Sequence, residues 1–179
     1  MSASFGRGLH AAPGRSVSAL SYDRYLGRWS RLSVPDLLAA AEVAQGHCVL
    51  DVATGTGEAA AMSIPIVGNT GFVVGADISL EMVTSARLRL DAPYFGPVNA
   101  DGQSLPFRDG AFDAVVCQLG IQFFPDPAAC LSEFRRVVRA DGMVAVCVNS
   151  TPDRLPMWGH LRDVLDRFLT QEQRAVLDM

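Results

Sequence analysis

The sequence of 179 residues contains no lysine, and all 15 of its basic residues are arginines. A chain without lysine cannot form a Walker-A phosphate loop, a Schiff-base lysine or a lysine general base. The arginines are scattered and the net charge is −4, so the clustered basic surface typical of nucleic-acid binding is missing. We therefore expect no nucleic-acid partner.

Long hydrophobic runs are also missing, although 49% of the residues are hydrophobic and only 19% are charged. A membrane-spanning helix needs about 20 consecutive apolar residues, and no segment approaches that length. The apolar residues instead form short runs bounded by Gly, Asp or Asn, such as 112–117 and 143–148, which is typical of buried strands. Residues 1–20 have no hydrophobic region of a secretory signal. The sequence thus predicts a globular protein without a membrane span.

The four cysteines show no C-x-x-C spacing, and three of them lie in apolar, strand-like runs. Cysteines in such runs usually pack as small hydrophobic side chains. We therefore expect no metal site and no redox role. A reducing cytoplasmic location is predicted.

Five strand-like segments alternate with helical segments along the chain. The strands are expected at 48–52, 72–77, 95–100, 112–118 and 143–148, and the helices at 34–44, 58–66, 80–90, 127–139 and 157–177. Gly46 is expected to end the first helix, and Asp141-Gly142 to form a turn before the last strand. Nearly all-apolar strands alternating with helices predict a doubly wound α/β fold, with a mostly parallel sheet covered on both faces.

A glycine-rich segment, Ala53-Thr-Gly-Thr-Gly57, follows the first predicted strand and precedes a helix. Glycines in such a turn allow positive φ and bring backbone N–H groups close to a ligand at the helix N-terminus. Asp77 ends the next strand, 20 residues after Gly57. In a doubly wound sheet, an acid at this position binds ribose hydroxyls. The combination predicts a cofactor that contains a nucleoside.

Two cofactor classes fit this loop. The segment from Gly55 to Ala60 satisfies the G-x-G-x-x-A pattern of dinucleotide-binding domains, which would indicate an NAD-dependent oxidoreductase. However, Asp51 precedes the loop and Glu58 follows it, and two acids are unfavourable beside a pyrophosphate. S-adenosylmethionine carries a sulfonium and an ammonium, which acids would attract, so we favour that cofactor.

Five motifs in order resemble those of class I S-adenosylmethionine-dependent methyltransferases of the ubiquinone/menaquinone-biosynthesis type. They cover 49–57, 73–79, 99–107, 112–126 and 133–142, within a resemblance that spans about residues 22–150. Ala53 replaces the commoner first glycine of this family, and Ala-Asp-Gly142 replaces its usual Pro-Gly-Gly. The resemblance implies a Rossmann-like sheet of order 3-2-1-4-5.

The resemblance also implies roles for individual residues. The methionine part of the cofactor would lie against Asp51 and the backbone of Ala53, Gly55 and Gly57, with Gln118 near its amino group and methyl. The adenosine part would contact Asp77 through the ribose, and Ile78, Met82, Asp101 and Gly102 through the adenine. An N-terminal lid would contain Tyr22, Tyr25 and Arg28. Structural alternatives stay open for some of these residues, since Asp-Gly is a common turn pair and Met82 has the spacing of a core residue.

Three parts are expected along the chain: an N-terminal extension and lid (1–30), the cofactor-binding core (31–150) and a C-terminal helix (151–179). Family members usually continue with a helix and two antiparallel strands, and this chain is expected to stop before those strands. The last strand would then be an exposed apolar edge, so we expect a homodimer through it or its coverage by the 157–177 helix.

The resemblance implies methyl transfer to a small-molecule acceptor. A sulfonium is already a good leaving group, so the reaction depends on alignment and exclusion of water. No catalytic residue can be identified from the sequence. An alternative hypothesis is a cofactor-binding or partner-binding domain without catalysis.

Overall fold

The computed structural model describes residues 30–150, 154 and 156–170, which divide into two compact units after Val148. The described residues of the second unit include helix α7 (Pro156–Leu165). It ends earlier than the predicted 157–177 helix, and residues 171–179 lie outside the described residues. In the described part of the chain, no helix is long and apolar enough to cross a membrane. The candidate site lies in the first unit.

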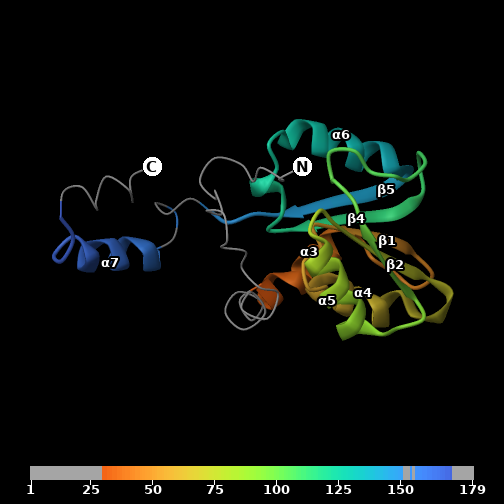
Figure 1. Ribbon diagram of the computed structural model, residues 1–179, viewed down its shortest axis with the longest axis horizontal. Helices are drawn as coiled ribbons and strands as arrows, with labels where there is room; N and C mark the ends of the chain where they lie inside the picture. The colour runs from red at the N-terminus through yellow and green to blue at the C-terminus, as the bar shows by residue number, and fades with distance from the viewer. Residues whose placement is uncertain (1–29, 151–153, 155, 171–179) are drawn as a thin grey trace. The chain divides into compact units, whose positions relative to one another are not determined.

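The first unit is built on a five-stranded parallel sheet with the order β3-β2-β1-β4-β5, which confirms the predicted topology (Figure 1). The strands are β1 (Cys48–Val52), β2 (Phe72–Asp77), β3 (Phe95–Asn99), β4 (Phe112–Gln118) and β5 (Val138–Cys147). Because all neighbours are parallel, the carboxyl ends of the strands meet at one edge of the sheet, where doubly wound folds bind ligands.

Helices cover both faces of this sheet. They are α3 (Val34–Ala40), α4 (Glu58–Val67), α5 (Leu80–Leu90) and α6 (Pro127–Val137), with 3-10 turns η1 (Arg31–Ser33), η2 (Gly68–Thr70) and η3 (Ile121–Phe123). Helices α3, α4 and α5 lie on one face and α6 lies on the other (Figure 1). This arrangement gives three layers.

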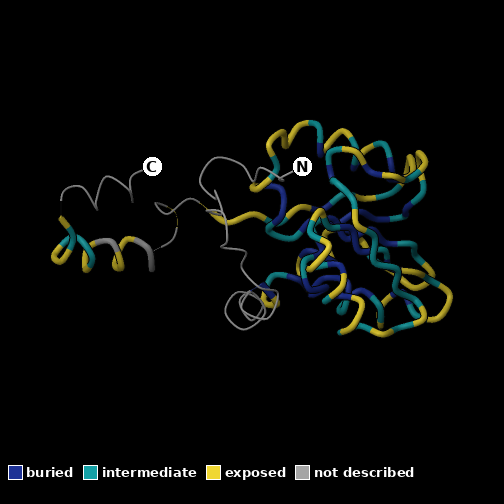
Figure 2. The backbone as a smooth tube through the Cα atoms, viewed as in Figure 1, coloured by how far each residue is buried: buried dark blue, intermediate teal, exposed yellow. Residues whose placement is uncertain are grey.

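Two buried apolar clusters hold the layers together. Val49 of β1 belongs to the cluster under α3 and α4, whereas its neighbour Leu50 belongs to the cluster with Phe134 of α6. Successive side chains of a strand point to opposite faces, so each central strand contributes to both clusters. The central strands β1 and β4 are almost entirely buried, within the dark blue interior of the first unit in Figure 2. Burying one Val, Leu or Phe side chain stabilises the fold by about 1.5–3 kcal/mol.

Helix α3 ends at Ala40, four residues before the predicted end at 44. Glu42 adopts a positive φ of 50°, its N–H donates to the carbonyl of Ala39, and the N–H of Val43 donates to that of Leu38. These two bonds form a Schellman motif, which closes a helix with a left-handed residue that is usually glycine. The sequence predicted a helix to 44 that Gly46 ends, because glycine commonly follows a helix and a glutamate at position 42 does not indicate a left-handed conformation.

Strand β5 begins at Val138, five residues earlier than predicted, and the expected turn at Asp141-Gly142 lies within it. Val138 pairs with Phe112 and Met143 with Ala114, so four residues of β5 face the single Asp113 of β4. A Cβ on Gly142 would lie 2.5 Å from the Asp113 carbonyl oxygen. The predicted turn is therefore a bulge inside the strand.

Candidate functional site

The loop between β1 and α4 has three residues in the left-handed region: Ala53 (φ 58°), Gly55 (φ 56°) and Gly57 (φ 87°). The positive φ of Gly57 favours glycine, and a Cβ there would also displace the end of the Leu90 side chain, whose Cδ1 would lie 2.8 Å away. The Cβ of Ala53 has room because the residue that faces it is Gly120. A Cβ added to Gly120 would lie 2.4 Å from the Ala53 Cβ. The loop lies at the carboxyl edge of the sheet, with Ala53 and Gly55 half-buried and Thr54, Thr56 and Gly57 buried.

Asp51 is the most deeply buried acid of the site, with 1% of its surface exposed. Its Oδ2 accepts hydrogen bonds from Thr54 Oγ1 (2.7 Å) and Ala60 N (3.1 Å). Its Oδ1 is buried and has no partner among the described residues. Burial, assisted by the charge of Asp77, raises the pKa of Asp51 to about 7, against the two hydrogen bonds. A buried carboxylate oxygen without a partner favours a cationic ligand.

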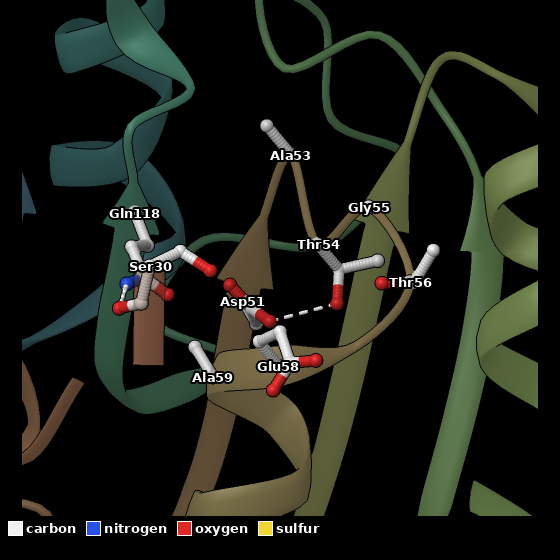
Figure 3. A pocket seen from close by; sticks show the side chains of 9 residues that line it. All are labelled: Ser30, Asp51, Ala53, Thr54, Gly55, Thr56, Glu58, Ala59 and Gln118. Carbon is white, nitrogen blue, oxygen red and sulfur yellow. Dashed lines mark hydrogen bonds between the residues drawn. The ribbon is translucent and has the colours of Figure 1, made fainter. Parts of the chain in front are cut away.

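This carboxylate lies at a cavity of about 20 Å³, large enough for one water molecule. Figure 3 shows Asp51 between Ser30 and Thr54. The Gln118 side-chain amide donates to the Ser30 carbonyl and, at 3.2 Å, to Ser33 Oγ. The segment that precedes α3 is thereby held against one side of the cavity.

Glu58, the first residue of α4, is paired with two arginines. Its carboxylate lies 2.7 Å from Arg31 Nε and 2.7 Å from Arg89 Nη1. Burial by itself raises the pKa of Glu58, but the hydrogen bonds from Arg31 and Arg89 outweigh it, and the pKa is lowered. The charge of Glu58 is thus neutralised, and the sequence argument that it would repel a pyrophosphate is wrong. Of the two acids, only Asp51 keeps a carboxylate oxygen without a partner that would repel a pyrophosphate.

Asp77 joins the glycine loop to the start of α5. Its Oδ2 accepts from Gly55 N (2.8 Å) and its Oδ1 from Ser79 N (2.9 Å). Asn99 Nδ2 donates to the carbonyls of Asp77 and Ile78, both at 2.9 Å, and holds the turn between them. Burial raises the pKa of Asp77, although the hydrogen bonds from the Ser79 and Gly55 N–H groups lower it in part. Each carboxylate oxygen can accept a further bond, so hydroxyl groups can still bind there.

The loop after β3 begins with Asp101 and Gly102. Asp101 Oδ1 accepts from the Gln103 backbone N–H (2.9 Å), which is an Asx-type turn. A Cβ on Gly102 would lie 2.7 Å from the Phe124 ring and 2.9 Å from Val52 Cγ1, so only glycine fits. The Gln103 side-chain amide also donates toward both carboxylate oxygens of Asp101, at 3.3 and 3.4 Å. Asp101 has the structural role that the sequence left open, and its oxygens can each accept a further bond.

The structure brings four predicted residues together around the cavity: Asp51, Ala53, Gly55 and Gln118. Asp77 is joined to them through Gly55. Gly57, Ile78, Asp101 and Gly102 lie in the loops that follow β1, β2 and β3, and Met82 lies in the first turn of α5. Tyr22, Tyr25 and Arg28 lie outside the described residues.

Sequence reasoning missed several residues of the site. The cavity is also lined by Ser30, Thr54, Thr56 and Ala59, none of which was predicted, and by Glu58, which the sequence had placed beside the loop. Thr54 had a usable signal, because it lies in the loop three residues after Asp51. Ser30 had none, since its partner Gln118 is 88 residues away.

A glycine loop with acids at the ends of β1 and β2, on a sheet of this order, defines a class of protein: Rossmann-like domains that bind a nucleoside-containing cofactor. A buried acid with a free oxygen favours the cationic member of that class. The methyltransferase-domain family matches residues 50–146. The chain therefore belongs to the methyltransferase-domain family, and its cofactor is S-adenosylmethionine rather than NAD.

Named relatives agree with this family. The chain is 34% identical over 161 residues to a demethylmenaquinone methyltransferase of Mycobacterium sp. (strain KMS), covering 90% of this chain and 64% of that protein. It is 33% identical to the ubiquinone/menaquinone biosynthesis C-methyltransferase UbiE of Geotalea uraniireducens (strain Rf4), covering 70% and 53%. A putative methyltransferase of Bacillus halodurans C-125 has a similar structure, with a TM-score of 0.62, 27% identity, and 76% and 58% coverage. The chain thus spans less than two thirds of the two named enzymes.

Proposed function

We propose that the chain binds S-adenosylmethionine at the carboxyl edge of its sheet and transfers the methyl group to a small-molecule acceptor. The observation that carries this proposal is the buried, unpartnered Oδ1 of Asp51. An ammonium group would supply the missing partner and the opposite charge. The backbone of Ala53, Gly55 and Gly57 would surround the rest of the methionyl part.

The adenosine part would lie toward β2 and β3. Asp77 would accept from ribose hydroxyls with the lone pairs that Gly55 and Ser79 leave free. Ile78, which is 43% exposed, would pack on the base together with Met82. Asp101 and Gly102 would recognise the edge of the base. The lid of Tyr22, Tyr25 and Arg28 stays a proposal from the resemblance.

The bound cofactor supplies an activated methyl group, so the protein contributes orientation and exclusion of water. Gln118, at the end of β4, would leave Ser30 and orient the reactants.

The named relatives are, by their names, demethylmenaquinone and quinone-biosynthesis methyltransferases, which supports a quinone-type acceptor. Transfer assays on a panel of small quinones and phenols test this activity. Cofactor binding without turnover on that panel would favour the alternative of a binding domain without catalysis.

Calorimetry with two ligand classes tests the cofactor assignment. We expect the chain to bind S-adenosylhomocysteine, because its ammonium pairs with Asp51 and its ribose with Asp77. NAD should not bind detectably, since its pyrophosphate would approach the Asp51 carboxylate. Binding of NAD without binding of S-adenosylhomocysteine would contradict the proposal.

We further propose that the β5 edge pairs with a second copy of the chain. Among the described residues, β4 is the only strand that pairs with β5. The segment 142–148 has no charged side chain, and Met143, Val146 and Val148 are exposed. An uncharged edge with unpaired backbone groups favours strand pairing between chains. Such a dimer would leave the carboxyl edge of the sheet open to ligands.

Sedimentation velocity tests this dimer. We expect a concentration-dependent dimer that is lost in Val146→Lys, because edge lysines prevent pairing. Leu131→Lys, on the outer surface of α6, is the matched control and should leave the dimer intact. A monomeric wild-type chain with rapidly exchanging β5 amides would contradict the proposal.

The proposed location is the cytoplasm. All four cysteines are free thiols. Free thiols persist in a reducing compartment, which supports this location.

A further inference from the structure

Helix α6 holds the loop 101–110 through a row of side chains along one of its sides. Glu133 Oε2 accepts from the Leu105 backbone N–H at 2.7 Å. Arg136 Nη2 donates to the Leu105 carbonyl (2.9 Å), and its Nη1 donates to the Phe107 carbonyl (2.6 Å). Both backbone groups of Leu105 are therefore bonded to side chains of α6, and not to another strand or turn.

Glu133 and Arg136 also bond to each other in a two-point arrangement. Arg136 Nε lies 2.7 Å from Glu133 Oε1, and Nη2 lies 2.7 Å from Oε2. The Arg136 hydrogen bonds lower the pKa of Glu133, so the pair stays charged at neutral pH. Exposed ion pairs contribute little to stability, but the planar guanidinium fixes geometry because its donors have set directions. The main effect of this pair is to hold the loop in one shape.

The start of the same loop is held by α6 and by the residue that caps it. The Cys130 thiol donates to the Gly102 carbonyl at 3.3 Å. The Asp126 backbone N–H donates to Gln103 Oε1 at 2.8 Å, and Gln103 Nε2 lies 3.3 Å from Asp101 Oδ1. The position of the Asp101 carboxylate thus depends on contacts that α6 makes along the whole loop.

We propose that Glu133 and Arg136 are positioning residues for the nucleobase of the cofactor. They hold the 105–107 backbone so that Asp101, earlier in the same loop, presents its carboxylate to the exocyclic amino group of adenine. The inference rests on the proposed function, because it requires adenine to bind at Asp101. Neither residue contacts the cofactor in this arrangement, and both act through the loop.

A base-selectivity measurement tests this role. Calorimetry compares S-adenosylhomocysteine with S-inosylhomocysteine, in which an oxygen replaces the exocyclic amino group. We expect the wild-type chain to prefer the adenine ligand by about tenfold, since a hydrogen-bonding site rejects a ligand without the matching group. In Arg136→Gln and Glu133→Gln the preference should fall to about twofold, mainly through weaker binding of the adenine ligand. Arg135→Gln, at the neighbouring exposed position of α6, should keep the wild-type preference.

A double-mutant cycle then separates positioning from general destabilisation. If Arg136 acts through Asp101, Asp101→Ala combined with Arg136→Gln should bind the adenine ligand no more weakly than Asp101→Ala alone. Unchanged selectivity in both single variants, or equal loss for both ligands, would overturn the inference. If Arg136→Gln does not fold, Glu133→Gln decides, because it keeps the side-chain shape. Failure of the wild-type chain to bind S-adenosylhomocysteine would instead overturn the proposed function, and this inference with it.

Discussion

Asp51→Asn is expected to weaken cofactor binding at least about 30-fold and, at the same time, to stabilise the ligand-free chain. The first effect arises because the ligand ammonium would meet a neutral amide instead of a buried carboxylate, a change that costs about 2–5 kcal/mol for buried charge pairs. The second arises because Asn can still accept from Thr54 and Ala60 with its oxygen, while the unpartnered Oδ1 is replaced by a neutral group.

The stability gain should depend on pH with a defined sign. The pKa of Asp51 is raised from 3.8 to about 7 in the folded chain, so between these values the folded state holds a proton that the unfolded state lacks. The free energy of unfolding therefore falls as pH rises through this window. The burial cost is fully present above pH 7, where Asp51→Asn should stabilise the chain by on the order of 2 kcal/mol. Near pH 4 the substitution should change little.

Cofactor binding has the opposite dependence on pH. Below pH 7 the wild-type carboxyl must lose its proton to pair with an ammonium, so affinity should fall by about tenfold per pH unit. The Asn variant should lose this dependence. Calorimetry with S-adenosylhomocysteine and urea denaturation between pH 5 and 8 measure both effects. Asp113→Asn is the matched control, since Asp113 lies at the opposite end of the sheet and accepts from Cys48 N (2.6 Å). Unchanged affinity in Asp51→Asn would contradict the ammonium assignment.

Asp77→Ala should weaken cofactor binding by about 2–3 kcal/mol, the range for hydrogen bonds to a charged group. That corresponds to about 30-fold to 150-fold in the dissociation constant. The substitution should also lower the free energy of unfolding by about 1–2 kcal/mol, because the N–H groups of Gly55 and Ser79 lose their acceptor. The sequence alone indicated a strand end without such a structural role.

Ligand chemistry separates these two effects of Asp77. A cofactor analogue that lacks the ribose hydroxyls should bind the wild-type chain weakly and should lose little more in Asp77→Ala. Asp91→Ala, at the end of α5 in the same unit, is the control for a lost surface acid. Equal losses for the hydroxylated and deoxygenated ligands would show that Asp77 only supports the loop.

The fold class and the acids of β1 and β2 could be predicted from local patterns: apolar runs with the length of strands, glycines where φ must be positive, and motif spacing along one chain. The strand order was implied by the family resemblance that those motifs carry. The helix α3 and the bulge in β5 were misplaced because the prediction relied on local patterns. The four residues opposite Asp113 follow from the pairing of β5 with β4. Glu42 ends α3 in a left-handed conformation, which a glutamate does not signal in the sequence.

The hydrogen-bond and ion-pair partners of Asp51 and Glu58 can be seen only in the folded structure. Asp51 and Glu58 look equivalent in the sequence, on either side of one loop. Arg31 and Arg89 neutralise Glu58, whereas Asp51 keeps one buried oxygen without a partner. Arg31 lies 27 residues from Glu58 along the chain, and a contact at that distance exists only after folding. The electrostatic character of the site is therefore a property of the packed chain, because charge pairing depends on distances in space rather than on spacing in sequence.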